Sequence, residues 1–196
     1  MCNFAININL SHWGDTMKLS IAAALFLAAC LTAGNAVAGE VIGNTYIGER
    51  FGFIEVNAVD GKWEITDKEK TAANDIAGMV VHFKLKEKVS GWSPDVNITG
   101  FKKVGSFVTA DWVLNMMRDS WKGQGFTLNP IETGRISGRK IYFFEMQATL
   151  QGMEMKGRNV LLEGEKAFFL AAMATSAQSY QNLLPLFEEL IASAKY

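Results

Sequence analysis

Residues 140–162, KIYFFEMQATLQGMEMKGRNVLL, carry the strongest structural signal in the chain. Two runs of alternating apolar and polar residues flank Gln151-Gly152, a pair that can form a two-residue hairpin turn. Counting back from the turn sets the register, because side chains along a strand alternate between its two faces. The predicted cross-strand pairs are Leu150 with Met153, Thr149 with Glu154, Gln147 with Lys156, Glu145 with Arg158, Phe143 with Val160, and Ile141 with Leu162.

One face of this predicted hairpin is polar near its turn. The face carries Glu145, Gln147, Glu154, Lys156 and Arg158. One interpretation is a recognition patch for a partner. The other is a solvated hairpin tip whose opposite charges pair across the strands, and we favour it because such a tip needs no partner to explain its charges.

The chain after the hairpin predicts one more strand and a terminal helix. The strand covers residues 167–174, and the helix begins at Ser179 or Asn182 and ends near Ala194. Pro185 favours the later start, because proline fits best in the first turn of a helix. The helix should bury a stripe of apolar residues at helical spacing, which consists of Leu183, Leu186, Phe187, Leu190 and Ile191.

The chain before the hairpin predicts several strands and a helix. Asp60-Gly61 should form the turn between two of these strands. The expected strands cover residues 50–56, 62–66, 78–86, 95–101 and 125–128. Thr109 should cap a helix that ends near Lys122, with Asp111 favourably placed in its first turn. We expect its apolar stripe to be core rather than a ligand surface, and the stripe consists of Ala110, Val113, Leu114, Met117 and Trp121.

The amino-terminal residues predict export. Lys18 precedes an apolar run over residues 19–31, and Ala36-Val37-Ala38 follows as an A-x-A cleavage site. The run is shorter than the roughly 20 residues that span a bilayer. We therefore interpret residues 1–38 as an upstream extension plus a signal peptide that starts at Met17, and residues 39–196 as a single exported domain, periplasmic or secreted.

A second interpretation of the leader ends at Cys30. The residues Leu27-Ala28-Ala29-Cys30 resemble a bacterial lipobox, in which the cysteine becomes the acylated first residue. Acylation would make the protein a lipid-anchored envelope lipoprotein without a spanning helix. From the sequence, a membrane is expected as a partner only if Cys30 is lipidated. Soluble export remains the favoured alternative.

The residue inventory narrows the possible functions. The chain has 196 residues, a formal net charge of −1 and 49% hydrophobic residues, which suits one globular domain and disfavours a nucleic-acid binder. Residues 39–196 contain no Cys, and His82 is their single His. That excludes thiol chemistry and multi-His metal sites, and no GxSxG or Walker A motif is present. We predict no catalytic residue, no cofactor and no metal site, with His82 on the polar side of a strand that also carries Val80 and Lys84.

The order of these elements resembles the PsbP and DcrB superfamily. The resemblance covers about residues 50–196 and rests on order and spacing. Its opening lacks the family's proline, because Asp60-Gly61-Lys62 precedes Trp63. The matching stretches are Phe51-Gly52-Phe53, residues 95–99, Trp121-Lys122-Gly123, Gly125-Phe126, residues 136–142, residues 166–170 and residues 184–193.

The resemblance implies an α+β fold in which helices flank an antiparallel β-sheet as an α-β-α sandwich. Family members serve as photosystem II subunits, periplasmic or lipoprotein factors, or binding adaptors, and no shared catalytic centre comes with the fold. We therefore expect an exported, non-enzymatic binding or assembly module of the cell envelope, with a protein partner there. The alternative is a periplasmic small-molecule or metal-binding protein with a carboxylate site, and a hydrolase with a carboxylate pair is the least favoured.

Overall fold

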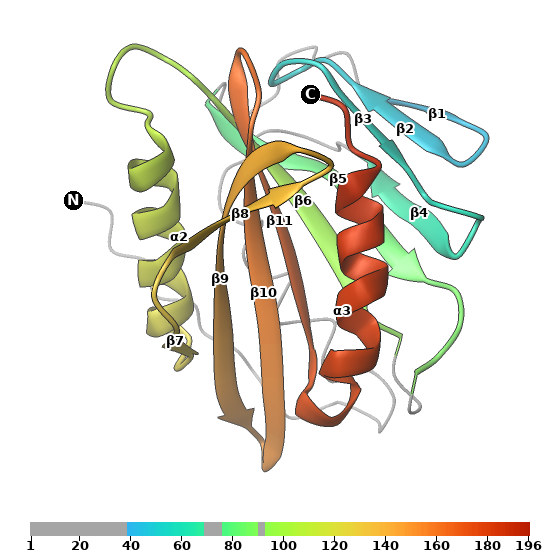
Figure 1. Ribbon diagram of the computed structural model, residues 1–196, viewed down its shortest axis with the longest axis vertical. Coiled ribbons are helices and arrows are strands. Elements are labelled where there is room, and N and C mark those ends of the chain that lie inside the picture. The colour runs from blue at the N-terminus through green and yellow to red at the C-terminus, as the bar shows by residue number, and fades with distance from the viewer. Residues whose placement is uncertain (1–38, 69–75, 90–92) are drawn as a thin grey trace, which may run out of the picture.

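The computed structural model describes residues 39–68, 76–89 and 93–196, and the predicted leader, including Cys30, lies outside them. An eight-stranded antiparallel sheet forms the centre (Figure 1). Within the described residues, a small three-stranded sheet and two helices complete the fold. The elements are β1 (Glu40–Ile42), β2 (Thr45–Gly48), β3 (Ile54–Asn57), β4 (Trp63–Lys68), β5 (Ala77–Leu85), β6 (Asp95–Lys102), α2 (Ala110–Gly123), β7 (Thr127–Leu128), β8 (Glu132–Ile136), β9 (Arg139–Leu150), β10 (Met153–Glu163), β11 (Ala167–Ser176) and α3 (Ala177–Ala192).

The large sheet has the order β4-β5-β6-β11-β10-β9-β7, and β8 also pairs with β9. The β9–β10 hairpin has the predicted register at every predicted pair. Gln151 and Gly152 both have positive φ, at 53° and 80°, as a tight two-residue turn requires. The α+β fold class and the long antiparallel hairpin are therefore confirmed.

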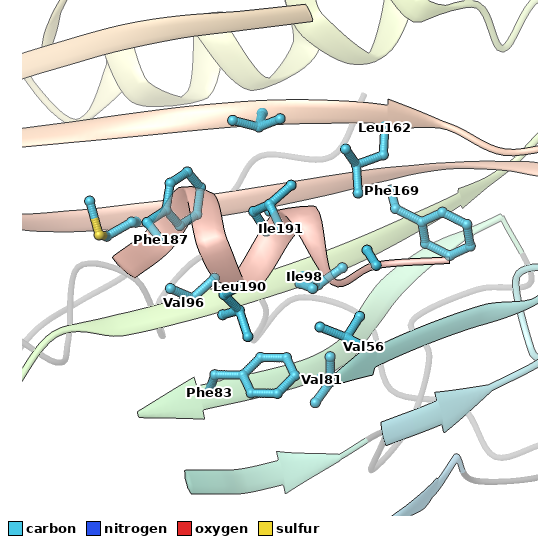
Figure 2. Packing of buried hydrophobic residues seen from close by; sticks show 14 of the residues in the cluster. Val56, Val81, Phe83, Val96, Ile98, Leu162, Phe169, Phe187, Leu190 and Ile191 are labelled. Carbon is cyan, nitrogen blue, oxygen red and sulfur yellow. The ribbon is translucent and has the colours of Figure 1, made fainter. Parts of the chain in front are cut away.

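The two helices cover opposite faces of the large sheet, which makes the predicted sandwich. Thr109 caps α2 as expected, and its Oγ1 accepts the Trp112 N–H at 3.1 Å. The α2 stripe is core, with Val113, Leu114, Met117 and Trp121 buried. On the other face, Phe187, Leu190 and Ile191 of α3 pack among residues of β3, β5, β6, β10 and β11 (Figure 2).

The start of α3 differs from the prediction. The helix begins at Ala177, with Ser176 as its cap, and Pro185 lies inside it. Ser176 Oγ accepts the Ser179 N–H at 3.3 Å, so the cap fixes the earlier start. Proline leaves the carbonyl four residues earlier without its helical donor. Because Pro185 and Gln181 are both exposed, water can reach that carbonyl and the helix continues.

The predicted turn at Asp60-Gly61 connects two strands that do not pair with each other. The turn exists, with φ of 50° and 67°, but it leads from one sheet to the other. Strand β3 pairs with β2, and β4 pairs with β5. Burial explains the difference, because Ile54, Val56 and Trp63 all enter the α3-side core. Strands β1, β2 and β8 were not predicted from the sequence.

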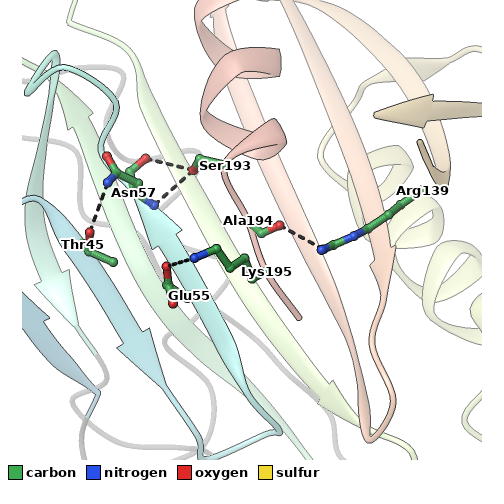
Figure 3. Close-up of polar contacts among 7 residues, drawn as sticks. All are labelled: Thr45, Glu55, Asn57, Arg139, Ser193, Ala194 and Lys195. Atoms are coloured by element: carbon green, nitrogen blue, oxygen red, sulfur yellow. Dashed lines mark hydrogen bonds and ion pairs between the residues drawn. The ribbon is translucent and has the colours of Figure 1, made fainter. Parts of the chain in front are cut away.

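The carboxy-terminal tail fastens the small sheet to the large one (Figure 3). Ser193 Oγ accepts the Asn57 N–H at 3.0 Å. Glu55 and Lys195 exchange two backbone hydrogen bonds of 2.8 Å, and their side chains form an ion pair at 2.6 Å. From β9, Arg139 donates to the Ala194 carbonyl at 3.0 Å. The tail therefore holds both sheets in one arrangement at this edge.

Candidate functional site

The predicted polar patch divides into two parts in the structure. Gln147, Glu154 and Lys156 line a polar hollow of about 300 Å³ at the hairpin tip, together with Ala177 at the start of α3. Glu145 and Arg158 lie further along the hairpin, on the part of the sheet that α3 covers. The structure thus brings the outer three residues together at a surface and places the inner two against α3.

The Arg158 guanidinium is held by its own chain. It lies 4.1 Å from the centroid of the Phe143 ring, and its Nη1 is 3.1 Å from Glu188 Oε1 on α3. The side chain is only 12% exposed. The expected solvated pair of Glu145 with Arg158 is therefore wrong: the two residues are cross-strand neighbours, but α3 supplies the partners of their charged ends.

Glu145 accepts a hydrogen bond from the buried Tyr180 hydroxyl at 2.8 Å. Burial raises the pKa of Tyr180 well above its ordinary value, and the Glu145 carboxylate raises it further. The phenol therefore stays protonated and continues to donate at any physiological pH. The inner half of the predicted patch joins α3 to the hairpin.

His82 lies on the opposite side of its strand from the core residue Phe83 and is 3.6 Å from Asp95 Oδ1. Val80 was expected on the same face of the strand as His82, but it lies in the core. A register shift between Met79 and Val81 turns both Val80 and Val81 inward. Within the described ranges, no three His, Cys, Asp or Glu side chains come together as a metal site requires.

The other end of the large sheet has a larger hollow, of about 670 Å³. It lies where the β2–β3 connection, the end of β6 and the β10–β11 turn meet. Its charged lining consists of Arg50, Lys102, Lys103 and Lys166, with Glu49 and Glu165. Basic groups therefore outnumber carboxylates in this hollow.

Aromatic rings support several of these basic groups. The Arg50 guanidinium and the Lys102 ammonium lie 5.3 Å and 5.9 Å from the centroid of the buried Phe51 ring. Lys103 lies 4.6 Å from the centroid of the Phe168 ring and also forms an ion pair with Glu163 at 2.9 Å. Such cation–π contacts stabilise a cation without neutralising its charge.

Exposed apolar side chains lie at the same end of the sheet. Phe53 and Val104, which are 47% and 41% exposed, line the hollow. The loop from β6 to α2 then presents Phe107, and the first turn of α2 presents Trp112, with the two rings edge to face at 6.4 Å. We call this surface the aromatic–basic end, and its members are Arg50, Phe53, Lys102, Lys103, Val104, Phe107, Trp112 and Lys166.

No family model and no curated protein matches this chain. Among solved structures, the cyanobacterial PsbP protein CyanoP from Synechocystis sp. PCC 6803 superposes with a TM-score of 0.54 at 13% identity, over 86% of this chain and 98% of that chain. The chain has a PsbP-like fold. LpqN of Mycobacterium tuberculosis, a protein involved in cell envelope biogenesis, superposes with a TM-score of 0.50 at 10% identity, over 72% of this chain and 82% of LpqN.

A Bacteroides thetaiotaomicron protein also shares the PsbP-like fold, with a TM-score of 0.51 at 12% identity, and the match covers 79% of this chain but 48% of that one. At such identities the likeness shows the fold alone. The PsbP-like fold therefore fixes how the elements are arranged, and the site has to be argued from this chain's own residues.

The aromatic–basic end was not found by sequence reasoning. Residues 104–107, Val-Gly-Ser-Phe, show no helical or strand period and stand just before the cap Thr109. Trp112 lies beside the buried stripe of α2, so periodicity does not show that it is exposed. The available sequence signal for this surface was the presence of apolar residues in a short loop that has no helical or strand period.

Proposed function

We propose that the protein is an exported, non-enzymatic binding or assembly module of the cell envelope, and that the aromatic–basic end is its binding surface. One observation carries the proposal: exposed Phe53 and Val104 line a basic hollow at one end of the domain, and the adjoining β6–α2 loop and first turn of α2 expose Phe107 and Trp112. Exposed apolar side chains that form a group, rather than occurring singly, are typical of an interaction surface.

Export rests on the order of Lys18, the apolar run and the A-x-A site. No helix in the described part of the chain is long and apolar enough to cross a membrane. Mass spectrometry of the native protein should find an amino terminus at Gly39. An intact terminus at Met1 or Met17 would contradict export, and an acylated Cys30 would establish the lipid-anchored alternative.

Photocrosslinking in living cells tests the binding surface. A photoreactive amino acid replaces Trp112 in one variant and Met153, which is 39% exposed at the hairpin tip, in a matched control. We expect a discrete crosslinked product, to protein or to lipid, from position 112 and little from position 153. Equal capture from both positions, or none from position 112, would overturn the assignment.

A further inference from the structure

We propose that the aromatic–basic end docks on an anionic phospholipid surface. This inference rests on the proposed function and names the target of its binding surface. Phe107 and Trp112 enter the membrane interface, while Arg50, Lys102 and Lys166 reach the headgroup phosphates. The contact does not depend on acylation of Cys30, which the sequence alone made the condition for a membrane contact.

The charges at this end favour an anionic target. Lys103 is engaged by Glu163, but Arg50, Lys102 and Lys166 have no ion-pair partner among the described residues. Glu49 and Glu165 share the hollow, so three unpaired basic groups stand against these two carboxylates. Basic side chains near an anionic membrane each add attraction, and long basic side chains extend their charge while the stem rests on apolar surface.

The apolar side chains at this end are exposed on a protruding connection, as insertion into a lipid interface requires. Residues 104–107 are four consecutive exposed residues that connect β6 to α2 at one end of the sandwich (Figure 1). Phe107 is 56% exposed and Trp112 is 38% exposed. Aromatic residues concentrate at membrane interfaces, where apolar rings meet polar headgroups. These two rings stand on a connecting loop and in the first turn of a helix.

Asp111 is an acidic group beside these rings. It lies in the first turn of α2, where the positive end of the helix dipole partly offsets its charge. Its position therefore weakens the attraction to phosphate without reversing it, since Arg50, Lys102 and Lys166 lie at the same end of the sheet.

The start of the described chain lies at this same end. Glu40 pairs with Ile47, which places Gly39 beside Gly48, and both glycines lie against the Tyr46 ring. Gly48 is two residues before Arg50 of the hollow. A fully extended chain from residue 31 to residue 38 reaches at most about 28 Å. An acyl group on Cys30 would therefore hold the aromatic–basic end towards the membrane, so both leader interpretations allow this orientation.

Vesicle flotation tests the proposal. The processed protein is purified from cells in a Cys30→Ser background, so that no acyl chain contributes, and is mixed with phosphatidylcholine vesicles with or without phosphatidylglycerol. We expect binding to the phosphatidylglycerol vesicles, weakened by salt. Lys102→Gln and Lys166→Gln should each lower the partition coefficient about fivefold, the equivalent of about 1 kcal/mol for one basic residue near the surface.

Matched variants at the opposite end of the sheet distinguish binding through this surface from nonspecific binding to vesicles. Phe107→Ser with Trp112→Ser should lower partitioning, whereas Met153→Ser and Lys156→Gln at the hairpin tip should leave it unchanged. Equal binding to both vesicle types, equal losses at both ends, or no binding would each overturn the membrane proposal. A protein crosslink at position 112 without vesicle binding would overturn it while leaving the proposed function intact, and failure of both experiments would remove both.

Discussion

At the hairpin end of the large sheet, Arg158 lies on Phe143 and pairs with Glu188, while Glu145 accepts the Tyr180 hydroxyl. At the opposite end, Arg50, Lys102 and Lys166 have no carboxylate partner within the described ranges, and exposed Phe53 and Val104 line the same hollow. Charged residues in a sequence therefore do not mark a binding surface by themselves. What distinguishes the two ends is whether the fold supplies partners for the charged groups.

Trp121 and Trp112 of α2 should show the largest difference between a structural and a surface role. Trp121 is 3% exposed, and its Nε1 donates to the buried Asn159 Oδ1 at 3.1 Å. Trp121→Ala should lower the free energy of unfolding by about 3–5 kcal/mol, as should Phe187→Ala in α3. Trp112→Ala in the same helix should change it by less than about 1 kcal/mol, because this ring is 38% exposed. Denaturant unfolding measures all three, and similar losses at Trp121 and Trp112 would remove the distinction.

Arg158→Ala should have the next largest effect. Its side chain is almost fully buried, so the loss combines packing on Phe143 with the ion pair to Glu188. Glu188 is 45% exposed and can be hydrated once unpaired, which limits the expected cost to about 2 kcal/mol.

The outer patch residues provide the control for Arg158. Gln147→Ala and Glu154→Ala, both at exposed positions, should each cost less than about 0.5 kcal/mol in the same denaturant titration. A comparably small cost for Arg158→Ala would instead support the interpretation of this hairpin face as a solvated surface.

The sequence predicts local structure well here and long-range partners poorly. The β9–β10 register follows from a turn and an alternation that lie within one stretch of chain. The partner of Arg158 is Glu188, on a helix that returns over the sheet, and cross-strand counting cannot find it. The same limit applies at Asp60-Gly61: the turn residues were right, but burial against α3 decides which strands pair.

The candidate site lay further beyond sequence reasoning than the fold. The aromatic–basic end combines Arg50 and Lys166 from two connections with Lys102 from the end of β6, and only the sheet order brings these together. Periodicity identified the buried side of α2, yet it could not tell whether Trp112 beside that side met another element or solvent. Surfaces made of loops carry little periodic signal, because loop side chains follow no fixed repeat.

Tyr180→Phe should have a smaller effect, of about 1 kcal/mol at neutral pH, because it removes one hydrogen bond to Glu145 and little packing. The dependence of the free energy of unfolding on pH tests whether the Tyr180 hydroxyl is responsible. An unfolded tyrosine ionises near pH 10, whereas Tyr180 stays protonated in the folded protein because its pKa is raised. The unfolded state then binds fewer protons above about pH 10, so stability should fall as pH rises there. Tyr180→Phe should lack this part of the alkaline loss, and parallel stability curves for the two proteins would contradict the assignment.

A small expected change in stability at the aromatic–basic end gives the sharpest comparison. The double variant Phe107→Ala/Trp112→Ala removes two rings that are 56% and 38% exposed and contact each other edge to face, so folding buries less of what is lost than at Trp121. Its free energy of unfolding should stay within about 1 kcal/mol of the wild type. The two rings touch, so each single variant should already lose much of the mutual contact, and the double variant should cost less than the sum of the two. A loss near that of Trp121→Ala would mean that the rings belong to the core, whereas unchanged stability with lost vesicle partitioning would show that this end binds while the hairpin end holds the fold.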